Sequence, residues 1–192
     1  MAPQLPRARP VLAFDPELLL AAQDVRVAFF DVDGVLTDGG IYFTEAGETL
    51  KRFSVLDGYG LQMLRKAGIE PVVVTGRDSA PLRARLQALG VQHARYGVMD
   101  KVAASVEILT ALGVDWAQTA AIGDDWPDLP VLRRVAFSAA PANAHPEVAA
   151  SVRYVTRLRG GEGAAREFCD LLLCASGRYA SLLDAACGVP DA

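Results

Sequence analysis

The chain has few of the residues that build disulfide frameworks and transition-metal sites. Of its 192 residues, three are cysteines (Cys169, Cys174 and Cys187) and two are histidines (His93 and His145). The cysteines are odd in number and form no Cys-x-x-Cys pair, and the histidines lie far apart, so neither a disulfide framework nor a zinc site is indicated. We predict that the thiols are packing or surface groups, and we assign the histidines no role.

Long apolar runs and large blocks of one charge are also missing. No stretch approaches the about 20 apolar residues that a membrane span needs. The apolar stretch near the N-terminus is interrupted by Asp15, Pro16 and Glu17. The apolar core of a signal peptide would not contain such residues. The formal net charge is −4, and the 19 lysines and arginines are scattered. Nucleic acid and membranes are therefore poor candidate partners, and we expect a cytoplasmic protein that binds a small molecule.

The chain does contain a repeated alternation of strand-like and helix-like segments. Short runs rich in valine, isoleucine or aromatic residues predict strands, and segments with helical periodicity lie between them. The predicted strands cover residues 25–30, 71–76, 119–124 and 135–140, and the predicted helices cover 59–67, 79–89, 101–112 and 128–134. Gly68, Gly90 and Gly113 follow three of these helices, as expected of left-handed C-terminal caps. The alternation predicts an α/β fold with a doubly wound parallel sheet.

One domain accounts for most of the chain. We predict an N-terminal arm at 1–24 with a short helix at 16–22, a domain at 25–178 and a frayed C-terminal tail at 179–192. Within the domain, strand-like residues flank a turn over 45–47, which is typical of a β-hairpin at about residues 40–54. Gly47 is suited to the positive φ of that turn.

Two acidic residues end the first predicted strand. Asp31 and Asp33 are two residues apart, so in an extended chain they point the same way, and Gly34 then lets the backbone turn. Open α/β sheets bind ligands at the carboxyl ends of their strands. Adjacent carboxylates repel unless a cation or a shared proton offsets them, so the pair favours a metal site or acid–base chemistry. An ordinary Asp-Gly turn is the alternative.

Residues suited to an anionic ligand follow later in the chain. Thr75, Gly76 and Arg77 end the strand at 71–76, where a hydroxyl and free backbone N–H groups can hold phosphoryl oxygens at a helix start. Lys101 begins the next predicted helix and can neutralise a phosphoryl group, although a lone lysine is more often a surface charge. Neither feature is specific by itself; what matters is that they follow the first acidic pair in this order along the chain.

A second acidic cluster follows the strand at 119–124. Asp124 and Asp125 end that strand, and Asp128 lies in the first turn of the next helix, where a negative charge is favourable in itself. Together with the first acidic pair, Asp124 and Asp125 make an oxygen-rich site of the kind that Mg²⁺ prefers.

In this order the segments DVDGVLTDGG, VVTGRD, DK and GDDWPD resemble the four motifs of the haloacid dehalogenase-type phosphatases. The resemblance implies a two-step phosphoryl transfer, with Asp31 as the nucleophile that becomes an aspartyl-phosphate and Asp33 as the acid and base. It also implies a Mg²⁺ ion held by the Asp31 carboxylate, the Asp33 main-chain carbonyl and Asp124. The other implied roles are substrate binding by Thr75, Gly76, Arg77 and Lys101, and support by Asp125 and Asp128.

The spacing between these motifs leaves no room for a cap domain. An uncapped site would stand open to water, and the hairpin has edges that need covering, so a neighbouring subunit could close the site. In its short, capless form the chain resembles the family of phosphatases that act on 3-deoxy-D-manno-octulosonate 8-phosphate (Kdo-8-phosphate) on the way to lipopolysaccharide. That family is tetrameric, with hairpins meeting at the centre, which implies a homotetramer here.

The identity of the sugar is less well defined by the sequence. Related capless phosphatases act on nine-carbon sialic-type sugar phosphates. Arg77 suits the carboxylate of a sugar acid or is a surface residue at a helix start. Two departures from the Kdo-8-phosphate family bear on the sugar rather than the phosphoryl group: Leu56 replaces an arginine that many members carry, and Val98, Met99 and Asp100 replace a small polar run.

The remaining alternatives concern the C-terminal third and the overall function. The glycine-rich segment 159–163 either forms a turn before the last helix, which we favour, or brings Arg159 or Arg166 to an anion. Trp116 and Trp126 are predicted to be packing residues. Three other functions are alternatives to a phosphatase. A receiver domain lacks the second acidic pair, and a phosphomutase usually needs a cap domain. A non-catalytic oligomeric binding module of the same fold would not need these charged residues together.

Overall fold

A six-stranded parallel sheet forms the centre of the computed structural model, which describes residues 7–45 and 47–189. The strand order is β5-β4-β1-β6-β7-β8, and every neighbouring pair is parallel. The strands are β1 (Val27–Phe30), β4 (Glu70–Val74), β5 (His93–Arg95), β6 (Thr119–Ile122), β7 (Phe137–Ala140) and β8 (Tyr154–Val155). The predicted doubly wound sheet is confirmed. β5 and β8 were not predicted because edge strands this short carry too little periodicity.

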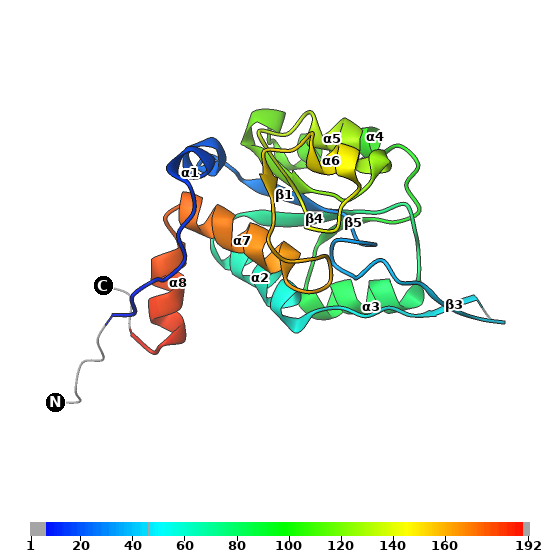
Figure 1. The fold of residues 1–192 in the computed structure, drawn as a ribbon, viewed down its shortest axis with the longest axis horizontal. Helices are drawn as coiled ribbons and strands as arrows, with labels where there is room; N and C mark the ends of the chain where they lie inside the picture. The colour runs from blue at the N-terminus through cyan, green and yellow to red at the C-terminus, as the bar shows by residue number, and fades with distance from the viewer. Residues whose placement is uncertain (1–6, 46, 190–192) are drawn as a thin grey trace.

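Helices cover both faces of the sheet (Figure 1). One layer holds α2 (Val55–Lys66), α3 (Ala80–Leu89) and α7 (Ala164–Ala175), with α1 (Pro16–Ala22) packed beside α7. The other layer holds α4 (Lys101–Leu112), α5 (Leu129–Leu132) and α6 (Pro146–Ala149). No helix in the described ranges is both long and apolar enough to cross a bilayer.

Alternating side chains of β1 build two separate cores. Ala28 and Phe30 point toward α2 and α7, whereas Val27 and Phe29 point toward α4 and α5. Phe30 meets Phe168 of α7 edge to face, with ring centroids 5.6 Å apart. Because each buried aromatic or aliphatic side chain contributes about 1.5–3 kcal/mol, the two cores hold β1 and its carboxyl end in place.

The predicted hairpin projects from the body of the protein (Figure 1). It consists of β2 (Tyr42–Thr44) and β3 (Gly47–Leu50), which pair antiparallel, and Gly47 has the expected positive φ of +101°. Ala46 of the predicted turn lies outside the described residues. The hairpin and α2 fill the chain between β1 and β4, so the prediction that the fold has no cap domain is confirmed.

Several predicted boundaries were wrong. α2 begins at Val55, not at residue 59, because Ser54 caps it by accepting a hydrogen bond from the Asp57 N–H. The helix predicted at 128–134 is a short 3₁₀ turn, Trp126–Asp128, followed by α5. The C-terminal segment is not simply frayed, because α8 (Tyr179–Ala186) packs Tyr179 and Leu182 against the core.

Candidate active site

A single cleft of about 440 Å³ lies at the carboxyl ends of β1, β4 and β6. Parallel strands bring their carboxyl ends to one edge of the sheet, so residues far apart in the sequence meet there. Every predicted site residue lines this cleft: Asp31, Asp33, Thr75, Gly76, Arg77, Lys101, Asp124, Asp125 and Asp128. Val98, Met99 and Pro127 complete its wall.

Lys101 connects two aspartates on the floor of the cleft. Its Nζ atom lies 2.5 Å from Oδ1 of Asp31 and 2.6 Å from Oδ1 of Asp128. Burial and the Asp128 charge raise the pKa of Asp31 to about 7, although Lys101 opposes them. Burial alone would lower the pKa of Lys101, but the two carboxylates outweigh burial and raise it. Lys101 is therefore a charged residue of the site and not a solvated surface lysine.

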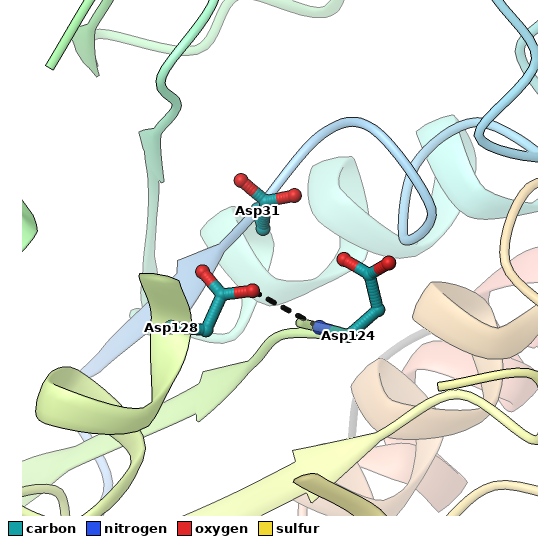
Figure 2. A group of neighbouring side chains, drawn as sticks. All are labelled: Asp31, Asp124 and Asp128. Carbon is teal, nitrogen blue, oxygen red and sulfur yellow. Dashed lines mark hydrogen bonds between the residues drawn. The ribbon is translucent and has the colours of Figure 1, made fainter. Parts of the chain in front are cut away.

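Asp128 also fixes the loop that carries the second acidic pair (Figure 2). Its Oδ2 accepts a hydrogen bond from the backbone N–H of Asp124 at 3.0 Å, the dashed line in Figure 2. The same oxygen accepts a second hydrogen bond from the backbone N–H of Asp125 at 3.3 Å. The Asp125 carboxylate accepts a hydrogen bond from the Trp126 N–H at 2.8 Å. Asp125 and Asp128 also form a capping box, in which the side chain of each accepts from the backbone N–H of the other. Asp128 therefore pairs with Lys101 through one oxygen and holds the loop after β6 through the other.

Three carboxylates are close enough to share one cation. Oxygens of Asp31, Asp124 and Asp128 lie within 4.8 Å of one another. Burial and the charges of Asp31, Asp128 and Asp125 raise the pKa of Asp124 to about 8. Carboxylates that disfavour each other's ionisation in this way are relieved by a divalent cation, and an all-oxygen donor set suits a hard ion such as Mg²⁺.

Gly34 allows the two acidic segments to approach each other. Its φ is +99°, and a Cβ atom at this position would overlap the carboxylate of Asp124. Asp33 and Gly34 thus form a turn, which was the alternative interpretation of this Asp-Gly sequence, but the turn is also part of the acidic site. A side chain here would strain the backbone and displace Asp124.

The end of β4 presents a hydroxyl and an arginine to the cleft. The Thr75 side chain is buried, and its Oγ1 accepts a hydrogen bond from the Arg77 N–H at 3.3 Å. Arg77 is half exposed, with Nε 3.8 Å from Oδ2 of Asp33 and Nη1 3.9 Å from Oε2 of Glu48. These separations are longer than direct hydrogen bonds, so Arg77 can turn toward an anionic ligand.

The sequence interpretation missed two residues, Glu48 and Lys51, that connect the hairpin to the cleft. Lys51, just after β3, pairs with Oδ1 of Asp33 and lies 3.0 Å from Oε1 of Glu48, and its side chain is fully buried. A signal did exist. Phe53 packs against the core, and in an extended chain residues two apart share a side, so Lys51 is expected to point inward with it.

Known proteins with related sequences are phosphatases. A family model described as haloacid dehalogenase-like hydrolase matches residues 96–168. The 3-deoxy-D-manno-octulosonate 8-phosphate phosphatase of Yersinia pestis is 43% identical over 159 residues, which cover 83% of this chain and 85% of that protein. The chain belongs to this phosphatase family, among the haloacid dehalogenase-like hydrolases.

Solved structures of family members share the fold. The Moraxella catarrhalis 3-deoxy-D-manno-octulosonate 8-phosphate phosphatase, in complex with magnesium, phosphate and KDO, has a TM-score of 0.85 at 37% identity and covers 88% of this chain and 98% of its own. A cobalt-bound form of the Haemophilus influenzae phosphatase has a TM-score of 0.83 at 40% identity, with the same coverage.

In this family member the glycine-rich segment at 159–163 is a turn that supports the loop after β1. Gly161 N–H donates to the Val35 carbonyl at 2.9 Å, and a Cβ on Gly160 would overlap the Gly34 carbonyl. Arg166 is paired with Asp170 at 2.8 Å on α7. Neither Arg166 nor the exposed Arg159 lines the cleft.

The Asp57 side chain of this hydrolase has a structural role. The Asp57 carboxylate accepts hydrogen bonds from the N–H groups of Gly163, at 3.3 Å, and Arg166, at 2.8 Å, at the start of α7. Burial raises the pKa of Asp57, and these hydrogen bonds oppose the shift. Asp57 therefore ties α2 to the N-terminus of α7.

The two tryptophans differ. Trp116 packs against Phe29, with ring centroids 6.1 Å apart, as predicted. The prediction for Trp126 was wrong, because this side chain is 59% exposed and its indole N–H donates to Nδ1 of His145 at 3.1 Å. The backbone N–H of His145 donates to the backbone carbonyl of Asp124 at 2.8 Å, so His145 supports the loop after β6.

Proposed function

We propose that this hydrolase is a Mg²⁺-dependent phosphatase that converts Kdo-8-phosphate to Kdo and phosphate in the cytoplasm, as a step toward lipopolysaccharide. The observation that carries the proposal is the meeting of Asp31, Lys101 and Asp124 in one cleft of a chain that is 43% identical to a phosphatase of that specificity. An ordered acidic and cationic site of this kind suits phosphoryl transfer, in which positioning and charge compensation supply most of the catalysis.

In the first step Asp31 attacks the phosphorus atom. The bond from phosphorus to the sugar oxygen breaks, and that oxygen takes a proton from Asp33, leaving an aspartyl-phosphate on Asp31. Lys101 engages one oxygen of Asp31, which leaves the other available for attack. Lys101 and Thr75 offset and hold the phosphoryl oxygens during the transfer.

In the second step Asp33 takes a proton from water, whose oxygen then attacks the aspartyl-phosphate. Phosphate leaves and the Asp31 carboxylate is restored, so each cycle returns both aspartates to their starting states. Mg²⁺, held by Asp31, Asp124 and the Asp33 main-chain carbonyl, would supply positive charge against the phosphoryl oxygens. Asp125 and Asp128 support the ligand loop.

Selectivity for a sugar acid is proposed to come from Arg77. Its guanidinium lines the cleft beside Gly76 and is half exposed, so it can form a two-point contact with the substrate carboxylate. The alternative substrate is a nine-carbon sialic-type 9-phosphate, which would present a carboxylate too, but farther from the phosphoryl group.

We also propose a homotetramer in which hairpins meet and a neighbouring subunit covers each cleft. The hairpin exposes Tyr42 (48%), Phe43 (65%) and Leu50 (56%), a large apolar surface for so small an element. Light scattering coupled to size-exclusion chromatography tests this assembly. A monomer at micromolar concentration would refute it.

The experiment for the activity is phosphate release from Kdo-8-phosphate, a nine-carbon sialic-type 9-phosphate and common hexose phosphates, each with Mg²⁺ and with EDTA, beside Asp31→Asn. Metal-dependent turnover that prefers Kdo-8-phosphate and is lost in the variant supports the proposal. Preference for the nine-carbon substrate would keep the phosphatase activity but make that sugar phosphate the substrate in place of Kdo-8-phosphate. Equal activity of variant and parent removes Asp31 as nucleophile, and no turnover of any substrate favours a non-catalytic binding module.

A further inference from the structure

We propose that Lys51 is a positioning residue that holds the carboxylate of Asp33 and thereby connects the β-hairpin to catalysis. The inference rests on the proposed function, because it takes Asp33 to be the acid and base of the phosphatase. Lys51 lies outside the four phosphatase motifs, on an element that contributes nothing to the sheet.

The burial of Lys51 is the first observation. Its side chain has 0% exposure, although the hairpin around it leaves Tyr42, Phe43 and Leu50 about half exposed or more. A buried ammonium is strongly disfavoured unless carboxylates pair with it. Lys51 has two such partners, Asp33 from the loop after β1 and Glu48 from β3. Within residues 7–45 and 47–189, the one carboxylate outside the hairpin that pairs with this buried cation is therefore that of the proposed catalytic acid.

The arrangement around Asp33 is the second observation. Lys51 contacts Oδ1 of Asp33, and Nε of Arg77 lies 3.8 Å from Oδ2, so a cation faces each oxygen of the carboxylate. Lys101 contacts Asp31 and Asp128 on the floor of the cleft. The two aspartates of the first motif are thus held by different lysines, one from α4 and one from the hairpin.

The two cations beside Asp33 differ in their freedom. Arg77 is 48% exposed and is the proposed partner of the substrate carboxylate, so substrate binding draws it from Asp33. Lys51 is buried between Glu48 and Asp33, and its ammonium can donate to Oδ1 of Asp33 whether or not the other oxygen of Asp33 carries a proton. Lys51 is therefore the contact that keeps Asp33 oriented while substrate is bound. Because its second partner lies within β3, the placement of the hairpin sets the placement of Asp33.

The test compares Lys51→Met and Lys51→Arg with the parent enzyme, using Kdo-8-phosphate as substrate. Methionine keeps the length of the side chain without its charge, and kcat is expected to fall about 10- to 100-fold with KM changed less than about threefold, since acid–base catalysis contributes about 100- to 10,000-fold. Arginine restores the charge and is expected to recover part of the lost kcat. The matched control is Arg52→Met on the next residue, which is 53% exposed and pairs with Asp38; it is expected to behave as the parent.

A second comparison separates positioning from general damage. If Lys51 acts through Asp33, then Lys51→Met adds no further loss of kcat to Asp33→Asn, whereas a merely structural defect would add its full effect. If Lys51→Met does not fold, Lys51→Gln, which keeps a hydrogen-bond donor, takes its place in both comparisons. An unchanged kcat, a change confined to KM, or additive losses would overturn the proposal. An inactive parent, or an Asp33→Asn variant as active as the parent, would instead overturn the proposed function.

Discussion

Mg²⁺ binding to the resting enzyme is expected to strengthen steeply between pH 6 and pH 8. The site in its metal-free form holds Asp31 with a pKa of about 7 and Asp124 with a pKa of about 8, both raised by burial and by neighbouring carboxylates. Below these values the two side chains carry protons, and a metal ion must displace them before it can bind. Affinity is therefore high above pH 8 and is lost as pH falls through 8 and then 7.

The magnitude follows from the two pKa values. At pH 6 the solution is about two pH units below the pKa of Asp124 and about one below that of Asp31, so both carboxyl groups are mostly protonated and compete with the metal ion. Between pH 8 and pH 6 the Kd for Mg²⁺ therefore rises roughly 100- to 1,000-fold. Isothermal titration calorimetry at pH 6, 7 and 8 measures this change. Repeating the titration in buffers with different ionisation enthalpies counts the protons released, which are expected to number about one to two near pH 6. A Kd that does not vary with pH, with no proton release, would refute the reasoning.

Three further outcomes are expected. Lys101→Met leaves Asp31 and Asp128 facing each other without their cation, so the free energy of unfolding in urea without Mg²⁺ falls by about 3 kcal/mol; an unchanged urea midpoint would contradict this. Gly34→Ala forces a side chain into positive φ and against Asp124, so we expect about 1–2 kcal/mol lower stability and weaker Mg²⁺ binding by calorimetry, and parental Mg²⁺ affinity would speak against the close approach. Asp57→Ala removes the N-terminal cap of α7, which costs about 1–2 kcal/mol in thermal unfolding while kcat stays within about twofold of the parent; a larger loss of kcat would assign Asp57 to the site.

The sequence predicted the cleft well because its residues follow strands that carry a strong signal. Asp31 and Thr75 come directly after buried apolar strands, Asp124 follows its strand after one glycine, and parallel strands place such positions at one edge. The burial of Lys101 was not predictable in this way, since it depends on the packing of α4 against β4 and α5.

What the sequence did not predict depends on contacts across long separations. Lys51 meets Asp33 only because the hairpin folds back over the loop after β1; the spacing from Phe53 indicates that Lys51 points inward, but not which residue it meets. Asp57 was assigned no role from the sequence, because its partners lie more than a hundred residues away, at the start of α7. α8 was missed because its short amphipathic pattern follows a glycine near the chain end, where fraying is the usual expectation.

The loop after β1 is enclosed by backbone on one side and by a carboxylate on the other. Gly160 lies against the Gly34 carbonyl, Gly161 lies against the backbone of Thr37, and Asp124 occupies the space beside Gly34. A segment packed this closely has no room to swing, so the nucleophile is presented in one fixed pose before substrate arrives. Substrate entry and product exit then proceed without movement of this loop, and the rate of turnover is accordingly expected to be indifferent to crosslinks that tether it.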